Sequence, residues 1–425
     1  MDVLVIEGGK PLSGSVRISG AKNAVLKLMA ASLLTSEECV IRNVPRIKDV
    51  ENMVDVLRGL GAQVEHDDSG VMRIQAGEAL SWEAPDDNAR EMRASIQIMG
   101  PLLARLGRVR IAHPGGCAIG TRPVDLHVAN LRKMGADLRD EFGYLTGACT
   151  RLTGQEIYLD IPSVGATENL MMAATLANGT TTVRNAAREP EVVEAQNFLN
   201  RMGARVRGAG TDTIRITGVS QLGGADHTVI PDRIEVGTYM VAAAMTRGEL
   251  LLSPVIPDHL EMVMAKLRQA GVEMDVQGEQ LFVRGPRSLR PLDIRTGPHP
   301  CFPTDMQPQF TAMLCLAQGT SIIMENVYSS RFKHVAEFLR MGAEITVDGR
   351  LAVVRGPCRL MGARISAMDL RAGASMVLAG LAAEGVTELE QVHHVDRGYE
   401  SLETKLRGVG AAIRRKSVVS AEALV

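Results

Sequence analysis

The residues with the clearest potential for chemistry lie in a glycine-rich loop, residues 113–127. This loop carries Cys117 among three glycines, and Arg122 follows five residues later. Glycines let a backbone bend and approach a ligand closely, and a long loop of this kind can close over a site as a lid. A nearby cation stabilises a thiolate and lowers the pKa of a cysteine from about 8.5. An inert thiol, the usual state of a single cysteine, suits the other five, whereas for Cys117 the loop leaves a reactive and an inert thiol equally open.

A proline-rich segment, residues 298–307, holds the second candidate. Asp305 stands beside Thr304 where an apolar helix is expected to begin. Asp is a common helix N-cap, so capping is one interpretation of this residue. The other interpretation is a general base, which would have to reach a substrate hydroxyl. The residue types alone leave both interpretations open.

Charged residues also introduce other apolar segments, at corresponding places of the repeat described next. They are Lys22 with Asn23, Arg93, Asp369 with Arg371, and Arg397. Helix N-termini favour anions, and guanidinium groups bind phosphate and carboxylate through paired hydrogen bonds. Most such residues in proteins simply face solvent. If the helix starts converge between two domains, however, the resulting cleft would be cationic and would suit a multiply anionic substrate.

A short phrase that ends in glycine recurs six times along the chain. Its glycines are separated by 74, 68, 68, 71 and 68 residues and stand at 61, 135, 203, 271, 342 and 410. Each phrase predicts the end of an amphipathic surface helix, a left-handed glycine that stops it, and a following strand. Between residues 49 and 60, for example, Val50, Met53, Val54 and Leu57 share one helical face.

A more apolar segment precedes each phrase and predicts a buried helix, because a helix that is apolar on nearly every side must be enclosed. These segments are 24–34, 95–106, 169–177, 237–245, 309–317 and 372–383. Each unit of about 70 residues is then strand, buried helix, strand, surface helix and strand pair. Six units predict an α/β protein of two three-repeat domains, 22–229 and 1–21 plus 230–425, rather than two unrelated α/β domains.

Composition narrows the class of protein. A formal net charge of −2 argues against a broad nucleic-acid-binding surface. No apolar run reaches the roughly 18 to 20 residues of a membrane span, and the first residues lack the pattern of a secretory signal. The six cysteines are dispersed without metal-ligand spacing and are typical of reduced thiols. We expect a cytoplasmic protein without nucleic-acid or membrane partners; the sequence identifies no protein partner.

Several motifs together resemble the UDP-N-acetylglucosamine 1-carboxyvinyltransferase family, from residue 6 to about residue 410. They are SGAKNA at 19–24, PGGCAIG at 114–120, RPVDLH at 122–127, SVGATE at 163–168, NAAREP at 185–190, FPTDMQ at 302–307 and HVDRGY at 394–399. The resemblance implies two inside-out α/β domains, each of three βαβαββ repeats, with the active site in the cleft between them. It also implies enolpyruvyl transfer from phosphoenolpyruvate to the 3-hydroxyl of UDP-N-acetylglucosamine, without a metal or organic cofactor, as the first committed step of peptidoglycan synthesis.

The family's residue roles carry over to matching positions. Cys117 resembles the general acid, which also forms a covalent adduct with phosphoenolpyruvate and reacts with the epoxide fosfomycin, and Asp305 resembles the base near the sugar 3-hydroxyl. The resemblance implies that phosphoenolpyruvate contacts Lys22, Asn23, Arg122 and Arg397. It implies that UDP-N-acetylglucosamine contacts Asn23, Arg93, Arg122, Pro123, Val124, Asp125, Leu126, Ser163, Val164, Gly165, Thr304, Asp305 and Val327. Asp369 and Arg371 are expected to support the site.

Three positions depart from the family pattern. Lys27 stands where Pro is common, Cys301 where Gly or Ala is common, and Ile161 precedes Ser163 where some relatives carry Lys. Two rival interpretations remain. One is 5-enolpyruvylshikimate-3-phosphate synthase, which shares the fold and donor but lacks the loop pattern of Cys117. The other is a non-catalytic paralogue that binds UDP-N-acetylglucosamine, whose expected mark would be the loss of residues such as Cys117 or Asp305.

Overall fold

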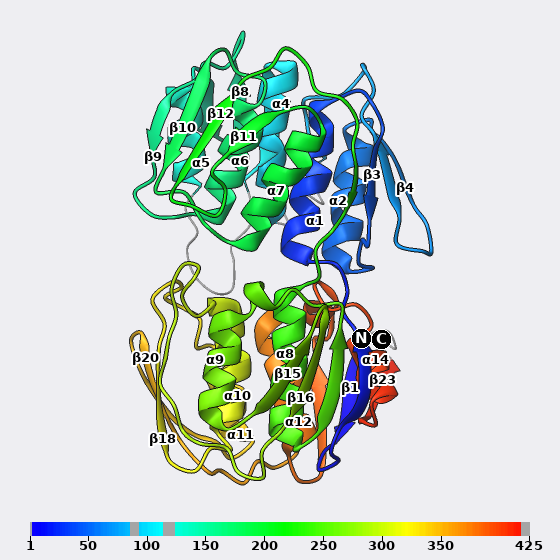
Figure 1. Cartoon of the computed structure of the whole chain (residues 1–425), viewed down its shortest axis with the longest axis vertical. Helices are drawn as coiled ribbons and strands as arrows, with labels where there is room; N and C mark the ends of the chain where they lie inside the picture. The colour runs from blue at the N-terminus through cyan, green and yellow to red at the C-terminus, as the bar shows by residue number, and fades with distance from the viewer. Residues whose placement is uncertain (1, 86–92, 114–123, 418–425) are drawn as a thin grey trace, which may run out of the picture. The chain divides into compact units, whose positions relative to one another are not determined.

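The computed structural model describes residues 2–85, 93–113 and 124–417, and only the backbone of residues 93 and 94. The described residues form two compact units. The N-terminal unit comprises residues 20–85, 93–113 and 124–230, and the C-terminal unit comprises residues 2–19 and 231–417. In each unit, helices are enclosed by several small sheets (Figure 1).

The N-terminal unit contains three sheets, with strand orders β13-β3-β5-β4, β6-β8-β7 and β11-β12-β10-β9. Their strands are β3 (Cys39–Arg42), β4 (Gln63–His66), β5 (Met72–Gln75), β6 (Arg108–Ala112), β7 (Asp137–Glu141), β8 (Tyr144–Ala148), β9 (Glu156–Tyr158), β10 (Thr180–Arg184), β11 (Arg205–Arg207), β12 (Thr213–Thr217) and β13 (Asp226–Thr228). In the third sheet, β9 and β10 are parallel and β10, β12 and β11 are antiparallel. This sheet and helices α6 (Val164–Ala174) and α7 (Pro190–Arg201) form a complete βαβαββ repeat.

The C-terminal unit also contains three sheets, with strand orders β15-β16-β14-β2, β17-β18-β20-β19 and β21-β22-β1-β23. Their strands are β1 (Asp2–Glu7), β2 (Ser13–Arg17), β14 (Glu249–Ser253), β15 (Glu273–Gln277), β16 (Gln280–Arg284), β17 (Ile294–Arg295), β18 (Thr320–Met324), β19 (Glu344–Asp348), β20 (Leu351–Arg355), β21 (Arg364–Ser366), β22 (Val386–Glu390) and β23 (Ala412–Ser417). The two ends of the described chain meet here, because β1 pairs with both β22 and β23.

The predicted buried helices are confirmed in all six repeats. They are α1 (Lys22–Ala31), α4 (Met99–Leu106) and α6 (Val164–Ala174) in the N-terminal unit, and α8 (Arg233–Thr246), α10 (Gln307–Leu314) and α12 (Leu370–Ala382) in the other. Every residue of α8 after Arg233 is buried. Short 3-10 helices extend three of them: η1 (Ser32–Leu34), η2 (Arg93–Ile98) and η4 (Thr304–Met306). None of the helices in the described residues is both long and apolar enough to cross a membrane.

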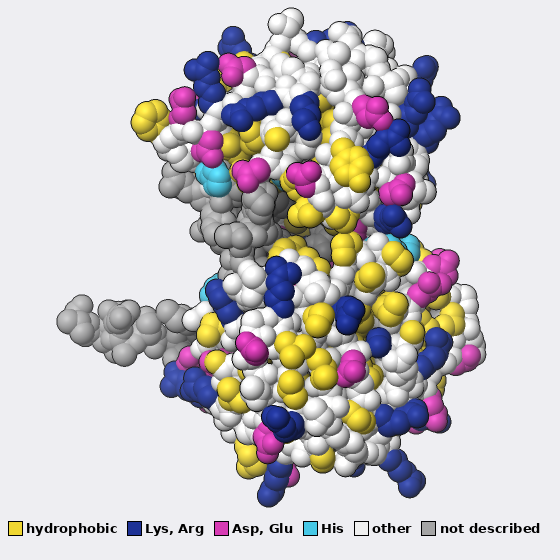
Figure 2. Space-filling model, turned by 90° about the vertical axis from the view of Figure 1, so that its left-hand side faces the viewer, with side chains coloured by type: hydrophobic (Ala, Val, Ile, Leu, Met, Phe, Trp, Pro, Cys, Tyr) yellow, Lys and Arg dark blue, Asp and Glu magenta, His cyan; other side chains and the backbone are white. Residues whose placement is uncertain are grey.

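The predicted surface helices and their glycine stops are also confirmed. The helices are α2 (Lys48–Gly59), α5 (Asp125–Lys133), α7 (Pro190–Arg201), α9 (Glu261–Ala270), α11 (Val335–Arg340) and α14 (Leu402–Gly408). All six following glycines have φ between 90° and 102°, in the left-handed region that other residues rarely adopt. A strand follows each of these glycines after one further residue. Charges of both signs are interspersed over each unit on the face shown in Figure 2.

Two strands differ from the simple repeat. Strand β2, which precedes α1, would be the first strand of the first repeat, but it pairs in parallel with β14 of the C-terminal unit. Strand β13, from the end of the third repeat, pairs in parallel with β3 in its place. In the described part of the second repeat, a parallel bridge between Glu83 and Arg110 takes the place of the expected first strand. Strand pairing therefore departs from sequence order where the chain passes between its two units.

The unusual Lys27 forms a buried ion pair. Its Nζ lies 3.2 Å from Oε2 of Glu168 on α6 and donates a 2.5 Å hydrogen bond to the carbonyl oxygen of Asn23. Glu168 is fully buried. Burial raises the pKa of Glu168 to about 7, and nearby Glu191 and Glu189 act in the same direction while Lys27 opposes them. A charge that the sequence places in an apolar helix is thus matched by a buried carboxyl on a neighbouring helix.

This buried carboxyl predicts a pH-dependent stability. Because the folded-state pKa of Glu168, about 7, lies above its ordinary value of 4.5, its stabilising contribution is complete below pH 4.5 and is lost as the pH rises through 7. The difference between the two pKa values corresponds to about 3 kcal/mol. We expect the free energy of unfolding of Glu168→Gln, measured by chemical denaturation from pH 4.5 to 8, to lack this decline. Exposed Glu65→Gln is the matched control, and parallel profiles for wild type and Glu168→Gln would contradict the assignment.

Candidate functional site

Part of the predicted site lies outside the described residues. Cys117, Arg122 and Pro123 belong to this part, and only the backbone of Arg93 is described, in η2. The remaining predicted residues fall at helix starts or in short loops of the two units.

Lys22, the first residue of α1, forms a buried ion pair that the sequence did not reveal. Its Nζ lies 2.7 Å from Oδ2 of Asp49, and the two side chains are 11% and 3% exposed. A cation at a helix N-terminus is opposed by the helix dipole, and Asp49 offsets this cost. An ammonium group has three N–H donors, so Lys22 can hold Asp49 and still bind an anion. Asp49 escaped prediction because an acidic residue in the first turn of α2 is an ordinary helix-start feature.

Two predicted nucleotide-binding segments, 124–126 and 163–165, lie close together in the N-terminal unit. Val124 is the N-cap of α5, and Ser163 caps α6 by accepting a hydrogen bond from the amide of Ala166 at 3.3 Å. A Cβ at Gly165 would lie 3.1 Å from Nε2 of Gln97, a tight contact, and 3.4 Å from Nε2 of His127 of α5, an ordinary van der Waals contact. The start of α6 is thus packed tightly against the first turn of α5.

Buried polar groups fix this junction. Gln97 donates a 3.1 Å hydrogen bond to the carbonyl oxygen of Gly165. Asn169 accepts from the amide of Gly100 at 2.7 Å, which orients its Nδ2 toward Nδ1 of His127 at 2.9 Å. Since Asn Nδ2 can only donate, a neutral His127 carries its proton on Nε2, the ring nitrogen nearest Gly165. The first turns of α4, α5 and α6 are therefore joined by side-chain contacts rather than by apolar packing alone.

In the C-terminal unit, Asp305 is held between two buried arginines. Its Oδ1 accepts from Nη2 of Arg331 at 3.0 Å, and its Oδ2 accepts from Nη2 and Nε of Arg371 at 3.1 and 3.3 Å. The arginine side chains are 2% and 4% exposed, whereas that of Asp305 is 26% exposed. The capping interpretation of Asp305 is wrong, because Pro303 and Met306 occupy the N-cap positions of η4 and α10. Arg331 was missed because nothing in its local sequence distinguishes it from a surface arginine.

Asp369 and Arg371 support this arrangement. Asp369 is the N-cap of α12 and accepts from the amides of Arg371 and Ala372 at 2.9 and 3.0 Å. Burial by itself would lower the pKa of Arg371, but the interactions with Asp305, Tyr399 and Asp232 together outweigh this effect and raise that pKa. The guanidinium carbon lies 5.6 Å from the centroid of the Tyr399 ring. Arg371 is thus fixed by contacts to a carboxylate and to an aromatic ring.

Tyr399 joins the starts of the three buried helices of this unit. Its hydroxyl lies 2.8 Å from Oγ1 of Thr238 on α8 and accepts from Nε2 of Gln309 on α10 at 3.3 Å. Burial raises the pKa of Tyr399. Arg397 ends the short helix α13 (His393–Asp396), two residues before Tyr399, and is partly exposed. The predicted residues Asp305, Arg371 and Arg397 therefore lie on elements that converge at one end of the unit.

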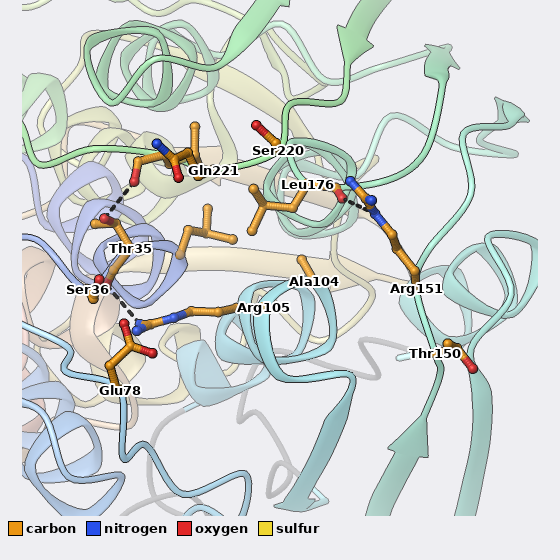
Figure 3. A pocket seen from close by; sticks show the side chains of 12 residues that line it. Thr35, Ser36, Glu78, Ala104, Arg105, Thr150, Arg151, Leu176, Ser220 and Gln221 are labelled. Carbon is orange, nitrogen blue, oxygen red and sulfur yellow. Dashed lines mark hydrogen bonds between the residues drawn. The ribbon is translucent and has the colours of Figure 1, made fainter.

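Each unit contains a cavity among its described residues. The cavity of the N-terminal unit, about 410 Å³, is lined by Arg105, Arg151 and Glu78 among others and by none of the predicted site residues (Figure 3). Arg105 donates to the carbonyl oxygens of Leu33 and Thr35, so it satisfies the end of the first buried helix. The cavity of the C-terminal unit, about 380 Å³, is lined by residues that include the exposed Cys301. Within the described ranges, no group of three His, Cys, Asp or Glu residues could hold a metal ion.

Comparisons with known proteins agree with this architecture. The family model described as EPSP synthase (3-phosphoshikimate 1-carboxyvinyltransferase) matches residues 6–406. The enolpyruvyl transferase NikO from Streptomyces tendae has a similar structure, with a TM-score of 0.90 at 28% identity over 98% of this chain and 99% of that one. EPSP synthase from Acinetobacter baumannii, at 19% identity, has a TM-score of 0.73 over 98% and 100% of the two chains and shares the fold.

Two relatives match much more closely in sequence. The chain is 52% identical over 412 residues to UDP-N-acetylglucosamine 1-carboxyvinyltransferase 1 of Caldanaerobacter subterraneus subsp. tengcongensis, with 97% of this chain and 99% of the relative covered. It is 54% identical over 416 residues to the protein of the same name from Symbiobacterium thermophilum, with 97% and 94% covered. The fold and the family match define an enolpyruvyl transferase. Within that family, the chain belongs to the UDP-N-acetylglucosamine 1-carboxyvinyltransferases.

The paired arginines predict a stability cost for removing Asp305. Asp305→Ala leaves two buried guanidinium groups without their shared carboxylate, and breaking a buried ion pair on one side costs about 3 kcal/mol. We expect a loss of this size in the free energy of unfolding, measured by chemical denaturation. Asp348→Ala, at an exposed position in the same unit, should leave the free energy nearly unchanged. An equal, small effect for both variants would show that the arginines do not depend on Asp305.

Proposed function

We propose that this chain transfers the enolpyruvyl group of phosphoenolpyruvate to the 3-hydroxyl of UDP-N-acetylglucosamine and releases phosphate. The observation that carries the proposal is the identity of more than half over nearly the whole chain with enzymes named for this reaction. The reaction is the first committed step of peptidoglycan synthesis, and we place it in the cytoplasm.

The anionic groups of phosphoenolpyruvate are bound by cations. Lys22 and Arg397, with Asn23 and Arg122, contact its phosphate and carboxylate. The pairing of Lys22 with Asp49 at 2.7 Å supports this role, because it holds the ammonium group at the start of α1 before substrate binds. Arginine keeps its charge at any working pH, so binding does not depend on protonation.

UDP-N-acetylglucosamine is bound by residues of both units. Those of the N-terminal unit are Asn23, Arg93, Arg122, Pro123, Val124, Asp125, Leu126, Ser163, Val164 and Gly165, and those of the C-terminal unit are Thr304, Asp305 and Val327. The close approach of α5 and α6 at Gly165 supports a common role for segments 124–126 and 163–165. Backbone amides at the start of a helix suit the diphosphate.

The chemistry is an addition followed by an elimination. Asp305 takes the proton of the sugar 3-hydroxyl as its oxygen bonds to C2 of phosphoenolpyruvate, and Cys117 donates a proton to the methylene carbon C3. The tetrahedral intermediate then loses a proton from C3 and phosphate from C2, which restores the double bond in the product. The buried side chains of Arg331 and Arg371 hold the Asp305 carboxylate in one orientation, which suits a positioned base.

The acceptor is the first test of this proposal. Phosphate release from phosphoenolpyruvate is measured with UDP-N-acetylglucosamine or with shikimate 3-phosphate in parallel, because the family model carries the name of the latter enzyme. We expect release, and an enolpyruvyl product by mass spectrometry, with UDP-N-acetylglucosamine alone. Release with shikimate 3-phosphate would identify the rival enzyme. Binding of UDP-N-acetylglucosamine without release would favour a non-catalytic paralogue.

The role of Cys117 predicts a specific chemical modification. Fosfomycin should add to one cysteine of the wild-type protein, and Cys117→Ser should abolish this addition and severely impair product formation or release. Mass spectrometry of peptides after labelling locates the adduct. Cys301→Ser is the matched control, because Cys301 is an exposed thiol in the described chain, and it should label normally. An adduct on Cys301 or another cysteine would overturn the assignment of Cys117.

A further inference from the structure

Glu325, directly after β18, is a fully buried carboxylate that organises three separate chain segments. Its Oε1 accepts from the amides of Val327 and Tyr328 at 2.8 and 3.0 Å and from Oγ1 of Thr296 at 2.8 Å. Its Oε2 accepts from Oγ1 of Thr304 at 3.0 Å. Two of these partners, Thr304 and Val327, are residues to which we assign sugar-nucleotide contacts.

A second set of hydrogen bonds closes the network. The hydroxyl of Thr296, which donates to Glu325, accepts from the amide of Asn326 at 2.9 Å. The side-chain amide of Asn326 donates to the carbonyl oxygen of Thr296 at 3.0 Å. The loop after β17 and the loop after β18 are therefore tied together around the carboxylate, and η4 is tied to both through Thr304.

The chemistry of the donors explains why this position favours a carboxylate. Burying a charged group is costly unless hydrogen bonds satisfy it, and four uncharged donors converge on Glu325. Hydrogen bonds to a charged acceptor are shorter and stronger than those between neutral groups. They therefore hold the donor groups in defined positions and also stabilise the buried carboxylate. The hydroxyl proton of Thr304 points to Glu325, which leaves its oxygen lone pairs for a ligand donor.

We propose that Glu325 is a positioning residue for the sugar-nucleotide acceptor. It holds the backbone at Val327 and the hydroxyl of Thr304, and Thr304 immediately precedes Asp305 in the same 3-10 helix. The inference rests on the proposed function, because it needs UDP-N-acetylglucosamine to contact these residues. Glu325 itself lies beneath them and acts through them. Its loss should therefore weaken the acceptor site far more than the phosphoenolpyruvate site.

The test compares Glu325→Ala with Glu325→Gln. Alanine removes the acceptor of all four hydrogen bonds, and we expect the KM for UDP-N-acetylglucosamine to rise about tenfold or more. The KM for phosphoenolpyruvate should change by less than about threefold, since its contacts are elsewhere. Glutamine keeps one oxygen for the donors on Oε1, and its amide can donate to Thr304, so it should recover most of the affinity. Glu344→Ala, at an exposed position of β19, is the matched control.

Two further measurements separate this inference from general destabilisation and from the proposed function. Hydrogen exchange at the amides of Val327 and Tyr328 should accelerate in Glu325→Ala while exchange in α12 is retained, and calorimetry should report weaker UDP-N-acetylglucosamine binding. Equal rises in both KM values, or no recovery in Glu325→Gln, would overturn the inference. A wild-type chain that does not bind UDP-N-acetylglucosamine would defeat the proposed function, and the inference with it.

Discussion

The enclosure of helices that are apolar on every side is the constraint from which the rest of this structure follows. Each unit surrounds three such helices with small sheets, so a polar side chain along their length would be buried without water. Polar side chains within these helices therefore need a buried partner, as Lys27 has in Glu168, whereas the unpaired backbone amides at the helix starts favour anionic ligands. The first two turns of α8, α10 and α12 accordingly meet around Tyr399, and those of α4, α5 and α6 meet around Gln97 and His127.

The charges at these helix starts and within the buried helices have charged partners in the protein itself. Lys22 is matched by Asp49, Lys27 by Glu168, and Asp305 by two arginines. Removing one member of such a pair leaves a buried charge whose cost greatly exceeds that of a surface charge. The pairs are therefore as much a part of the fold as the apolar core, and changes at the site affect stability together with activity.

The repeated features of the fold could be predicted from the sequence. Contacts between residues that lie far apart in the chain could not. The six glycine stops and the six apolar helices were predictable because each depends on residues within one or two turns of chain. The pairing of β2 with β14 was not, because a short strand carries no local mark of its partner. Asp49 and Arg331 were missed for the same reason, since each looks ordinary in its own segment and acquires its role from a residue on another element. Asp305 was identified as a candidate from the sequence. Only the structure shows that its carboxylate binds two arginines and does not cap a helix.

The two arginines around Asp305 also bear on how the proposed reaction ends. A guanidinium group stays protonated, so Arg331 and Arg371 always require negative charge nearby, and Asp305 supplies it in the resting protein. When Asp305 accepts the hydroxyl proton, that negative charge is lost and the local field becomes more positive by one charge. In a buried setting such a change acts strongly over short distances. In the proposed reaction, protonation of Asp305 would therefore leave the two guanidinium charges without their carboxylate until that proton is released.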